Sequence, residues 1–526
     1  MKIVLISQKF DINSATIDAI INKFNGDSIR LEIFSLEELA STGFTQKFTN
    51  YLNKLILKPI LAFEKKIASK KFSSYFRSPS NKFKKCKIKF DPFSIKKLSS
   101  IECPIDNVDA IINTSGIPLT ADLINKTSLG EFRLIKNSIE NSFFTKNCGL
   151  YEFFHNEKNL TLKVQYLSSK NNIPTCLFEG ILPSEEFWIR NNIRLKLKAT
   201  GLISYILSNN LLKKALASGN SHHQTRIDTN SSRIKIITKL YKTLFLYYFR
   251  KIKNRRREIH WDVFYSNESI YPFKYKNLKK LNNPPNCFLA DPFISFFNSR
   301  EIIFHEEFNY KERKGKISAT EIIDNKHNYL GTILEEPFHL SFPFLFEENN
   351  EIYMIPESYG SREIRLYRNI EYPTKWKLEK ILLQDVSAVD SMIIKVKDLY
   401  FLLTTLDTSN TEELSSELHI FYSKDLIKGN WININSGLPI FIDGTKGRNG
   451  GILYTKEELY RVAQVQEGIN YGKNIEIFTI EKINSISYRE KISNSMHLEA
   501  LNTKFDLHHH LNICGNFLVT DFGKVK

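Results

Sequence analysis

The spacing of hydrophobic residues changes partway along the chain. In roughly the first 210 residues, apolar runs such as KIVLIS at 2–7 and VDAIINTSG at 108–116 predict buried strands. Between them, SATIDAIINKF at 14–24 carries its apolar residues at helical spacing. Strands and helices that alternate in this way are typical of an α/β domain with a mainly parallel sheet. We therefore predict such a domain over residues 1–210.

From residue 259 onwards, apolar and polar residues alternate with period two, in short runs separated by turn residues. One phrase recurs, and its landmarks are 51, 48 and 59 residues apart, at Asp291, Phe342, Asp390 and Asn449. A repeat of about fifty residues with several short strands is typical of propeller blades. A β-sandwich would also have short strands, but it would not repeat one phrase. We predict a five-bladed β-propeller over 259–526, with HHHLNICGNFLVTDF at 508–522 in its last blade.

Acidic residues recur at corresponding places in these predicted blades. Asp291 and Asp390 begin two of them, while Glu307 and Glu357 end the strands that follow two of the landmarks. The innermost strands of a propeller line one central channel, so we expect these side chains to converge there. Converging carboxylates suit sugar hydroxyls, or the acid and base roles of glycosidic chemistry. The alternative is that each acid caps a turn or ties neighbouring blades together by hydrogen bonds.

Two basic segments carry much of the net charge of +17. Residues 211–258 are predicted as a polar linker followed by a helix, in which Arg233 to Arg257 contribute 10 basic residues and no acid. Residues 47–97, predicted as an insertion in the first domain, contain 15 Lys and Arg against two acids. Both segments mix charge with apolar residues, which predicts either helices on an anionic membrane surface or helices packed on their own domain. We expect no nucleic-acid partner, because no recognition motif accompanies the charge.

Cysteine usage and the missing targeting signals indicate a compartment. The six cysteines form no CxxC pair, which argues against a zinc module and a disulfide framework and favours a reducing environment. The first residues read as a strand rather than a signal peptide, and no apolar run reaches the length of a spanning helix. We expect a cytoplasmic protein, peripheral on the inner membrane surface if the basic segments bind lipid.

Motifs for cofactors and metals are missing from the sequence. There is no GxGxxG after the first strand, and no Walker loop, HExxH or GxSxG, so we predict no cofactor and no metal. The triplet HHH at 508–510 does not change this, because consecutive residues on a strand point to alternate faces. We expect one inward histidine there, His510.

Several ordered motifs in the second part resemble a known family. They are ADPFISFFNSREIIFHEEF, FHLSFPFLFEENNEIYMIPES, WKLEKILLQDVSAVDS, FYSKDL, YRVAQ and NYG. This part resembles the N-terminal domain of plant glucosamine inositolphosphorylceramide transferases, a domain also found in bacterial polysaccharide-cluster proteins. The resemblance implies a propeller like those of glycoside hydrolase family 43, and a role with glycans. It does not define the reaction, because in the plant proteins the glycosyltransferase is thought to be a different domain.

The resemblance also implies a set of polar residues at the propeller funnel. They are Asp291, Glu307, Glu357, Asp390, Arg448 and His510. We predict the four acids as catalytic residues and the other two as substrate-binding residues. Arg448 would bind a carboxylate or phosphate through its planar guanidinium, or form a salt bridge between blades.

The first part more weakly resembles the formyltransferase fold, a Rossmann-like α/β fold used on methionyl-tRNA and amino sugars. The motifs are VDAIINTSGIPL, LGEFRLIKNSIE and LTLKVQYLSSKNNIPTCLFEGILP. In that family an Asn, a His and an Asp move protons. Here the His position falls at Ile135 or Lys136 and the Asp position at Asn172, and only a desolvated Lys136 would serve as a base. We predict that formyl transfer is lost and that Asn137 and Asn172 bind a polar ligand.

Together these observations predict a carbohydrate-active protein. Our main hypothesis is a transferase component of surface polysaccharide or glycolipid biosynthesis, with a sugar, glycolipid or nucleotide sugar at the propeller funnel. Two alternatives stay open. One is a non-catalytic glycan-binding or scaffold protein, and the other is an amino-sugar N-formyltransferase.

Overall fold

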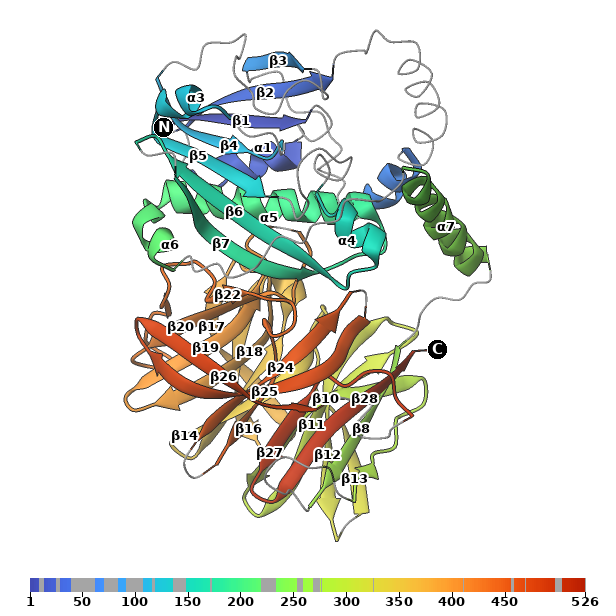
Figure 1. The fold of residues 1–526 in the computed structure, drawn as a ribbon. Helices are drawn as coiled ribbons and strands as arrows, with labels where there is room; N and C mark the ends of the chain where they lie inside the picture. Colours follow the sequence, from blue (N-terminus) through green and yellow to red (C-terminus); the bar gives the residue numbers. More distant parts are fainter. Residues whose placement is uncertain are drawn as a thin grey trace. The chain divides into compact units, whose positions relative to one another are not determined.

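The structure is a computed structural model of the chain (Figure 1). It describes residues 1–8, 14–24, 29–38, 62–70, 84–90, 107–115, 119–135, 148–170, 173–218, 233–252, 259–267, 275, 277–324, 326–409, 411–455, 458–468, 470–496 and 504–525. These residues form two compact units. The first comprises Met1–Arg256 with Thr408–Thr411, and the second comprises Arg257–Asp407 with Glu412–Lys526.

A mixed sheet forms the centre of the first unit (Figure 1). Its strands lie in the order β3 (Lys84–Phe90), β2 (Arg30–Glu38), β1 (Lys2–Gln8), β4 (Val108–Asn113), β5 (Thr127–Ile135), β6 (Asn159–Ser168) and β7 (Pro174–Pro183). Every pairing from β3 to β5 is parallel, and β6 and β7 add an antiparallel hairpin. The sheet thus has the parallel portion that the strand and helix rhythm predicts. The resemblance to formyltransferases stays a prediction.

The burial of the central strands accounts for the pattern of apolar residues in their sequence. Ile3, Val4, Leu5 and Ile6 of β1 are all fully buried. A parallel strand covered on both faces reads as a continuous apolar run. In β6, by contrast, buried and partly exposed residues alternate, as an antiparallel strand with one solvated face requires.

The described helices of this unit pack around the sheet and around one another. They are α1 (Ser14–Ile21), a helix at 62–68, α3 (Ala121–Asn125), α4 (Leu150–His155), α5 (Trp188–Ser208), α6 (Leu212–Ser218) and α7 (Arg233–Ile252). Residues of 62–68, α4, α5 and α7 share one apolar cluster. Within the described part of the chain, no helix is long and apolar enough to cross a bilayer.

The second unit is a five-bladed β-propeller, as the repeat predicts. The first blade consists of β10 (Cys287–Phe297), β11 (Arg300–Asn309), β12 (Lys314–Ile323) and β13 (Lys326–Leu334), and the second of β14 (Ser341–Glu348), β15 (Glu351–Glu357), β16 (Glu363–Glu371) and β17 (Lys375–Gln384). The third blade consists of β18 (Ala388–Val396), β19 (Leu399–Leu406), β20 (Glu417–Ser423), β21 (Ile432–Asn433) and β22 (Phe441–Ile442), and the fourth of β23 (Arg448–Tyr454), β24 (Leu459–Glu467), β25 (Asn470–Asn484) and β26 (Ser487–Met496). The fifth blade consists of β27 (Leu511–Cys514), β28 (Phe517–Val525), β8 (Ile259–Ser266) and β9 (Lys279–Lys280). The pairings within the blades are antiparallel.

The fifth blade closes the ring with strands from both ends of the unit. β28 pairs antiparallel with β8, so the last strand of the chain lies beside the first strand of the propeller (Figure 1). The first strand of each blade contacts the first strand of the next, from β10 through β14, β18 and β23 to β27 and back to β10. Closure gives every blade a neighbour on both faces, so that apolar residues on both faces of a blade are buried.

A β-bulge lies at corresponding places in the innermost strands of the first four blades. Pairing shifts between Ala290 and Phe293, Ser341 and Phe344, Val389 and Met392, and Asn449 and Gly451. In the first three blades the first bulge residue has positive φ, 49° for Asp291, 44° for Phe342 and 46° for Asp390. Three of the four landmarks of the repeat, Asp291, Phe342 and Asp390, are therefore bulge residues. Only Asn449 is one residue early, since it still pairs with Ala463.

These bulges have a consequence for the propeller axis. A non-glycine residue with positive φ costs on the order of 1–3 kcal/mol, and it persists where the surrounding structure holds it. Bulges also re-aim side chains and are frequent next to active sites. The repeated strain at Asp291, Phe342 and Asp390 thus points to the inner ends of the blades as the place to search for a functional site.

Candidate functional site

Asp291 connects three blades at the propeller axis. Its backbone N–H donates to Oδ2 of Asp521 in the fifth blade at 2.8 Å. Its own Oδ2 accepts from the backbone N–H of Phe342 in the second blade at 3.2 Å. Its Oδ1 accepts no hydrogen bond from the described residues and lies 3.4 Å from Nε2 of His509. Nδ1 of His509 is 2.8 Å from Oδ1 of Asp521, so one imidazole lies between two carboxylates.

Arg448 contacts Asp390, Glu357 and Tyr471. Its Nε donates to Oδ2 of Asp390, and its Nη2 donates to Oδ1 of Asp390 at 3.4 Å and to Oε2 of Glu357 at 3.3 Å. Gln464 also donates to Oδ2 of Asp390, at 2.8 Å. The ring centre of Tyr471 is 4.7 Å from the guanidinium carbon. The second, third and fourth blades thus each supply a side chain to one polar network.

Burial and mutual repulsion raise the pKa of several of these acids. Burial raises the pKa of Asp291 to about 7, with Asp521 and Asp390 adding to the shift and His509 opposing it. Burial also holds the pKa of Glu306 well above its usual value, and the charges of Asp291 and Glu357 raise it further. A negative charge in a poorly solvated space disfavours a second one nearby. The acids therefore do not all ionise together at neutral pH.

The pKa of Glu357 depends both on burial and on neighbouring charges. Burial and the neighbouring Asp390 hold the pKa of Glu357 well above its usual value, although Arg448 opposes the shift. Asp521 behaves in the opposite way: burial alone would raise its pKa, but His509 outweighs burial and lowers it. The pKa of His509 is raised in return, because Asp521 and Asp291 outweigh the lowering that burial causes. Neighbouring acids with pKa values pushed apart are the arrangement that separates a proton donor from a proton acceptor.

The strand register selects Glu306 rather than Glu307 as the partner of this cluster. Glu306 pairs with Ala290 and Glu357 pairs with Ser341, so both acids stand opposite the residue before a bulge. Both also follow their landmark by 15 residues, a spacing that would have identified Glu306 from the sequence. Successive residues on a strand face opposite sides, so Glu307 points elsewhere.

Glu307 has its own set of contacts within the first blade. Its Oε2 accepts from the hydroxyl of Tyr329, Lys316 Nζ is 3.6 Å from Oε1, and the thiol of Cys287 donates to Oε1 at 3.7 Å. The structure thus gathers Asp291, Glu357 and Asp390 of the predicted catalytic set around the axis and shows Glu307 in a separate ion pair.

In the histidine triplet at 508–510, the residue that contacts the buried acids is His509 and not the predicted His510. His510 packs against Phe293 and Phe342, with ring centres 4.5 Å and 5.5 Å away, and burial lowers its pKa to about 4. His509 is the histidine that contacts Asp291 and Asp521, and it stacks on Trp261 at 3.8 Å between ring centres. His510 is therefore a neutral ring in an aromatic environment, and the predicted binding role stays a prediction.

Sequence reasoning missed several members of the cluster. They are Glu306, Gln464, Tyr471, His509 and Asp521. Gln464 and Tyr471 stand in the motifs YRVAQ and NYG, which could have identified them, whereas nothing in the local sequence of Asp521 shows which distant strand it faces. The predicted ligands Asn137 and Asn172 of the first unit, and Lys136 beside them, lie outside the described residues.

One group in the cluster has donor atoms close enough for a cation. Single donor atoms of Asp291, His509 and Asp521 all lie within 4.8 Å of one another. The same atoms already have an explanation, since His509 lies between the carboxylates of Asp521 and Asp291, which raise its pKa and so favour the imidazolium. An ion pair therefore accounts for this arrangement.

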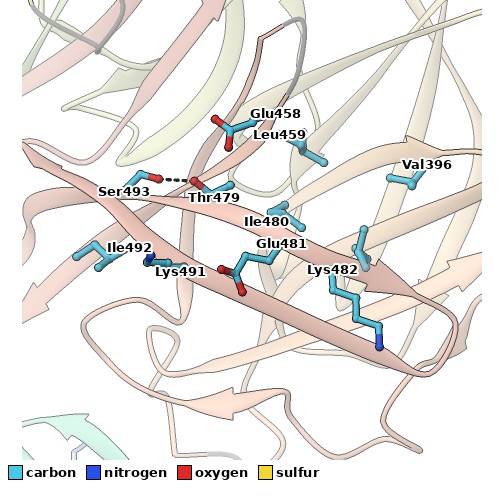
Figure 2. A pocket seen from close by; sticks show the side chains of 11 residues that line it. Val396, Glu458, Leu459, Thr479, Ile480, Glu481, Lys482, Lys491, Ile492 and Ser493 are labelled. Atoms are coloured by element: carbon cyan, nitrogen blue, oxygen red, sulfur yellow. Dashed lines mark hydrogen bonds between the residues drawn. The ribbon is translucent and has the colours of Figure 1, made fainter.

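A separate open cavity of about 880 Å³ lies on the outer strands of the fourth blade. Figure 2 shows residues of β25 and β26 along it, with the hydroxyls of Thr479 and Ser493 joined by a hydrogen bond. Glu481 and Lys491 line the same cavity. None of the polar residues gathered at the propeller axis lines this cavity, so the two features are distinct. We refer to those residues as the axial cluster: Asp291, Glu306, Glu357, Asp390, Arg448, Gln464, Tyr471, His509 and Asp521.

Solved structures that resemble this chain include several carbohydrate-active enzymes. The alpha-L-arabinofuranosidase of Podospora anserina is 10% identical, with 46% of this chain and 92% of that one covered and a TM-score of 0.33. A GH43_1 enzyme from Xanthomonas citri is 9% identical, with 46% and 88% covered and a TM-score of 0.34. The GH43 endo-arabinanase of Bacillus licheniformis is 16% identical, with 40% and 84% covered and a TM-score of 0.30.

Sequence relatives are found for the propeller. Glucosamine inositolphosphorylceramide transferase 1 of Arabidopsis thaliana is 37% identical over 212 residues, which are 39% of this chain and 27% of that protein. The protein of the same name from Oryza sativa subsp. japonica is 36% identical over 211 residues, 39% of this chain and 28% of its own length. The chain thus spans less than a third of these relatives.

The family comparison agrees with both relatives. Residues 251–511 match the family described as glucosamine inositolphosphorylceramide transferase 1, N-terminal. The resemblance expected for the second part of the chain is therefore confirmed, whereas the resemblance of the first part to formyltransferases stays a prediction. The propeller of this protein is similar to the N-terminal domain of the glucosamine inositolphosphorylceramide transferases.

Proposed function

We propose that the protein takes part in building a glycolipid or surface polysaccharide, and that the axial cluster of the propeller binds a sugar of its substrate. The observation that carries the proposal is the meeting of Asp291, Glu357 and Asp390, from three blades, around the cations Arg448 and His509. The name of the plant relatives, a transferase of glucosamine and inositolphosphorylceramide, supports a glycolipid as the class of substrate.

The exposure of the cluster indicates where a ligand would first meet it. The side chains of Arg448 and Glu357 are 14% and 11% exposed, while the side chain of Asp390 is 1% exposed. A ligand arriving from solvent would therefore contact the Arg448 and Glu357 pair, with Asp390 beneath it. Arg448 donates N–H bonds in a fixed plane and Glu357 offers carboxylate oxygens or a proton, a combination suited to sugar hydroxyls or a phosphate group.

The raised pKa values define chemical roles for an enzyme of this kind. Glu357 and Glu306 hold their protons to higher pH than ordinary carboxylic acids, so each is suited to donate a proton to a leaving oxygen. Asp291, with a pKa of about 7, is suited to accept a proton near neutral pH. We therefore propose Glu357 as the acid and Asp291 as the base if the protein acts on a glycosidic bond.

A second candidate function is glycan binding without turnover. The observation that favours it is how completely the carboxylates are already paired: Asp390 accepts from Arg448 and Gln464, and Asp521 binds His509. Acids engaged in this way stabilise the ring and position a ligand without transferring protons. The third hypothesis, amino-sugar N-formyl transfer, depends on Lys136 and Asn172, which lie outside the described residues.

The experiment that tests the proposal compares two glutamates. Purified protein is titrated with glucosamine, nucleotide sugars and inositol-phosphate glycolipids, and incubated with each to detect products. Glu357→Gln is expected to abolish product formation, whereas Glu307→Gln, which alters an ion pair of the first blade, leaves it unchanged. Product loss in both variants or in neither would contradict the assigned site.

Binding measurements with a third variant distinguish the two candidate functions. Arg448→Lys keeps a positive charge but loses the planar pair of donors, so we expect it to weaken sugar or phosphate binding at least tenfold. Binding that depends on Arg448 without any turnover would support the glycan-binding function. Sugar binding that is unchanged in Arg448→Lys and Glu357→Gln would show that the ligand sits elsewhere.

A further inference from the structure

Helix α7 has large apolar side chains on its exposed surface. Phe245 is 68% exposed, Ile252 80% and Tyr248 37%, the last with its ring packed against an aromatic ring of the helix at 62–68. These residues are three and four positions apart, so they form one stripe along the helix. Burying such a stripe in apolar surroundings is favourable, and leaving it in water is not. The stripe therefore points to a partner that takes up aromatic and aliphatic groups.

The adjacent side of α7 packs on other helices of the first unit. Leu240 and Leu244 are buried in a cluster with Phe153 of α4 and Trp188 of α5. Nζ of Lys239 donates to the backbone oxygen of Phe154 at 2.7 Å and to Oδ1 of Asn156 at 2.6 Å. The helix already has a packed face, so its exposed stripe is a second apolar surface.

The charge around the stripe restricts the kind of partner. The sequence from Arg233 to Arg257 has 10 basic residues and no acid, and the side chains of Lys235 and Lys242 are exposed on α7. This pattern suits an anionic partner that also accepts apolar side chains. A nucleic-acid backbone would meet the charge but not the aliphatic side chain of Ile252, whereas an anionic bilayer meets both.

We propose that α7 docks on an anionic lipid bilayer, with Phe245 and Ile252 inserted at the boundary between headgroups and acyl chains and Tyr248 at the edge of the contact. The neighbouring lysines bind the lipid headgroups, each contributing to adsorption as long as salt does not screen it. This inference does not depend on the proposed sugar site, because it rests on a different unit and on different residues.

Vesicle sedimentation of the full-length protein tests the proposal. The protein is mixed with vesicles of phosphatidylcholine alone, or of phosphatidylcholine with phosphatidylglycerol, at low and high salt. We expect binding only to the anionic vesicles, weakened by salt. Ile252→Ser should lower the partition coefficient by roughly tenfold, since a buried isoleucine contributes about that factor or more. Lys242→Glu should lower it by a similar factor and reduce the dependence on salt.

A matched control is available in the second unit. Ile486, in the turn between β25 and β26, is 81% exposed, almost the same as Ile252, and no basic cluster of this kind surrounds it. Ile486→Ser should leave vesicle binding unchanged. All three variants change exposed side chains, so their melting temperatures should stay at the wild-type value.

Three results would overturn the inference. Equal binding to neutral and anionic vesicles would remove the role of the charge, and wild-type binding by Ile252→Ser would remove the role of the stripe. If Phe245→Ser changed the molecular mass in solution without changing vesicle binding, the stripe would be an interface between two copies of the chain instead.

Discussion

Arg448 in the fourth blade binds both carboxylate oxygens of Asp390 in the third blade, 58 residues earlier in the chain. A guanidinium and a carboxylate that meet through two parallel donors form one of the strongest polar contacts in proteins. Both side chains are largely buried, so each depends on the other to offset its loss of hydration. This pair ties two neighbouring blades together and also forms one wall of the proposed sugar site.

Removal of Arg448 should therefore destabilise the propeller strongly. Arg448→Met leaves Asp390 and Glu357 without their shared cation, and we expect the free energy of unfolding to fall by about 3–5 kcal/mol. Urea unfolding at neutral pH measures this change. Because the remaining acids can be protonated, the loss should shrink as the pH falls, and a loss that is constant with pH would contradict the ion-pair explanation.

The pKa of Asp291 makes stability depend on pH in a defined direction. Folding raises the pKa of this acid from 3.8 to about 7, so the folded state binds more protons than the unfolded state between those values. The contribution of Asp291 is therefore fully present below about pH 4 and is lost as the pH rises through 7. His509, whose pKa is also raised, loses its contribution in the same direction.

Asp291→Asn removes this titration while keeping an oxygen for the N–H of Phe342. We expect the variant to lose less stability than wild type between pH 5 and pH 8, by on the order of a few kcal/mol at about 1.4 kcal/mol per pKa unit. Urea titrations at several pH values check this. Glu312→Gln, which changes an exposed acid of the same blade, serves as the control and should follow the wild-type curve.

Glu306 and Glu307 should give opposite results although they are adjacent. Glu306 is a buried acid with a pKa raised by burial and by other acids, so Glu306→Gln should cost no stability at pH 8 while changing ligand binding at the axis. Glu307→Gln breaks the pair between this buried acid and Lys316 and should cost about 1–3 kcal/mol without affecting ligand binding. Thermal melts and ligand titrations of the two variants separate these outcomes, and a shared phenotype would be inconsistent with the register.

Two glycines test how tightly the blades fit together. Gly451 and Gly331 both have positive φ, 138° and 89°. A Cβ on Gly451 would lie 2.1 Å from the backbone oxygen of Leu511 in the next blade, whereas a Cβ on Gly331 would meet nothing within 4 Å.

Gly331→Ala should cost only its backbone strain, on the order of 1–3 kcal/mol. Gly451→Ala should cost clearly more, because the fourth and fifth blades must also move apart. Melting temperatures of the two variants measure the difference. Equal decreases in melting temperature would mean that the fourth and fifth blades can move apart without any loss of stability.

Local sequence was sufficient for the fold of the second unit. Period-two alternation and turn residues are local properties, and the landmarks Asp291, Phe342 and Asp390 recur because three blades have the same bulge at this position. The parallel portion of the sheet in the first unit was also predictable, since buried parallel strands read as continuous apolar runs. Two features of the described residues went beyond the predicted rhythm: the antiparallel hairpin of β6 and β7, and the strand β3, which lies within the predicted insertion at 47–97.

The candidate site was only partly predictable. Asp291, Glu357, Asp390 and Arg448 follow from the sequence, because they stand at repeated positions or in family motifs. Their partners depend on the ring itself: Asp521 reaches Asp291 across 230 residues, and Gln464 reaches Asp390 across 74. No local pattern encodes which strands a closed ring places side by side.

The sequence by itself thus determined the blades and the acids at their repeated positions, because these follow from short-range alternation and spacing. Tertiary structure decided that His509 rather than His510 contacts Asp291 and Asp521, because only the packing of distant strands fixes which of three consecutive histidines faces these acids. It also decided that β8 completes the last blade, since pairing between distant strands depends on ring closure rather than on either strand alone.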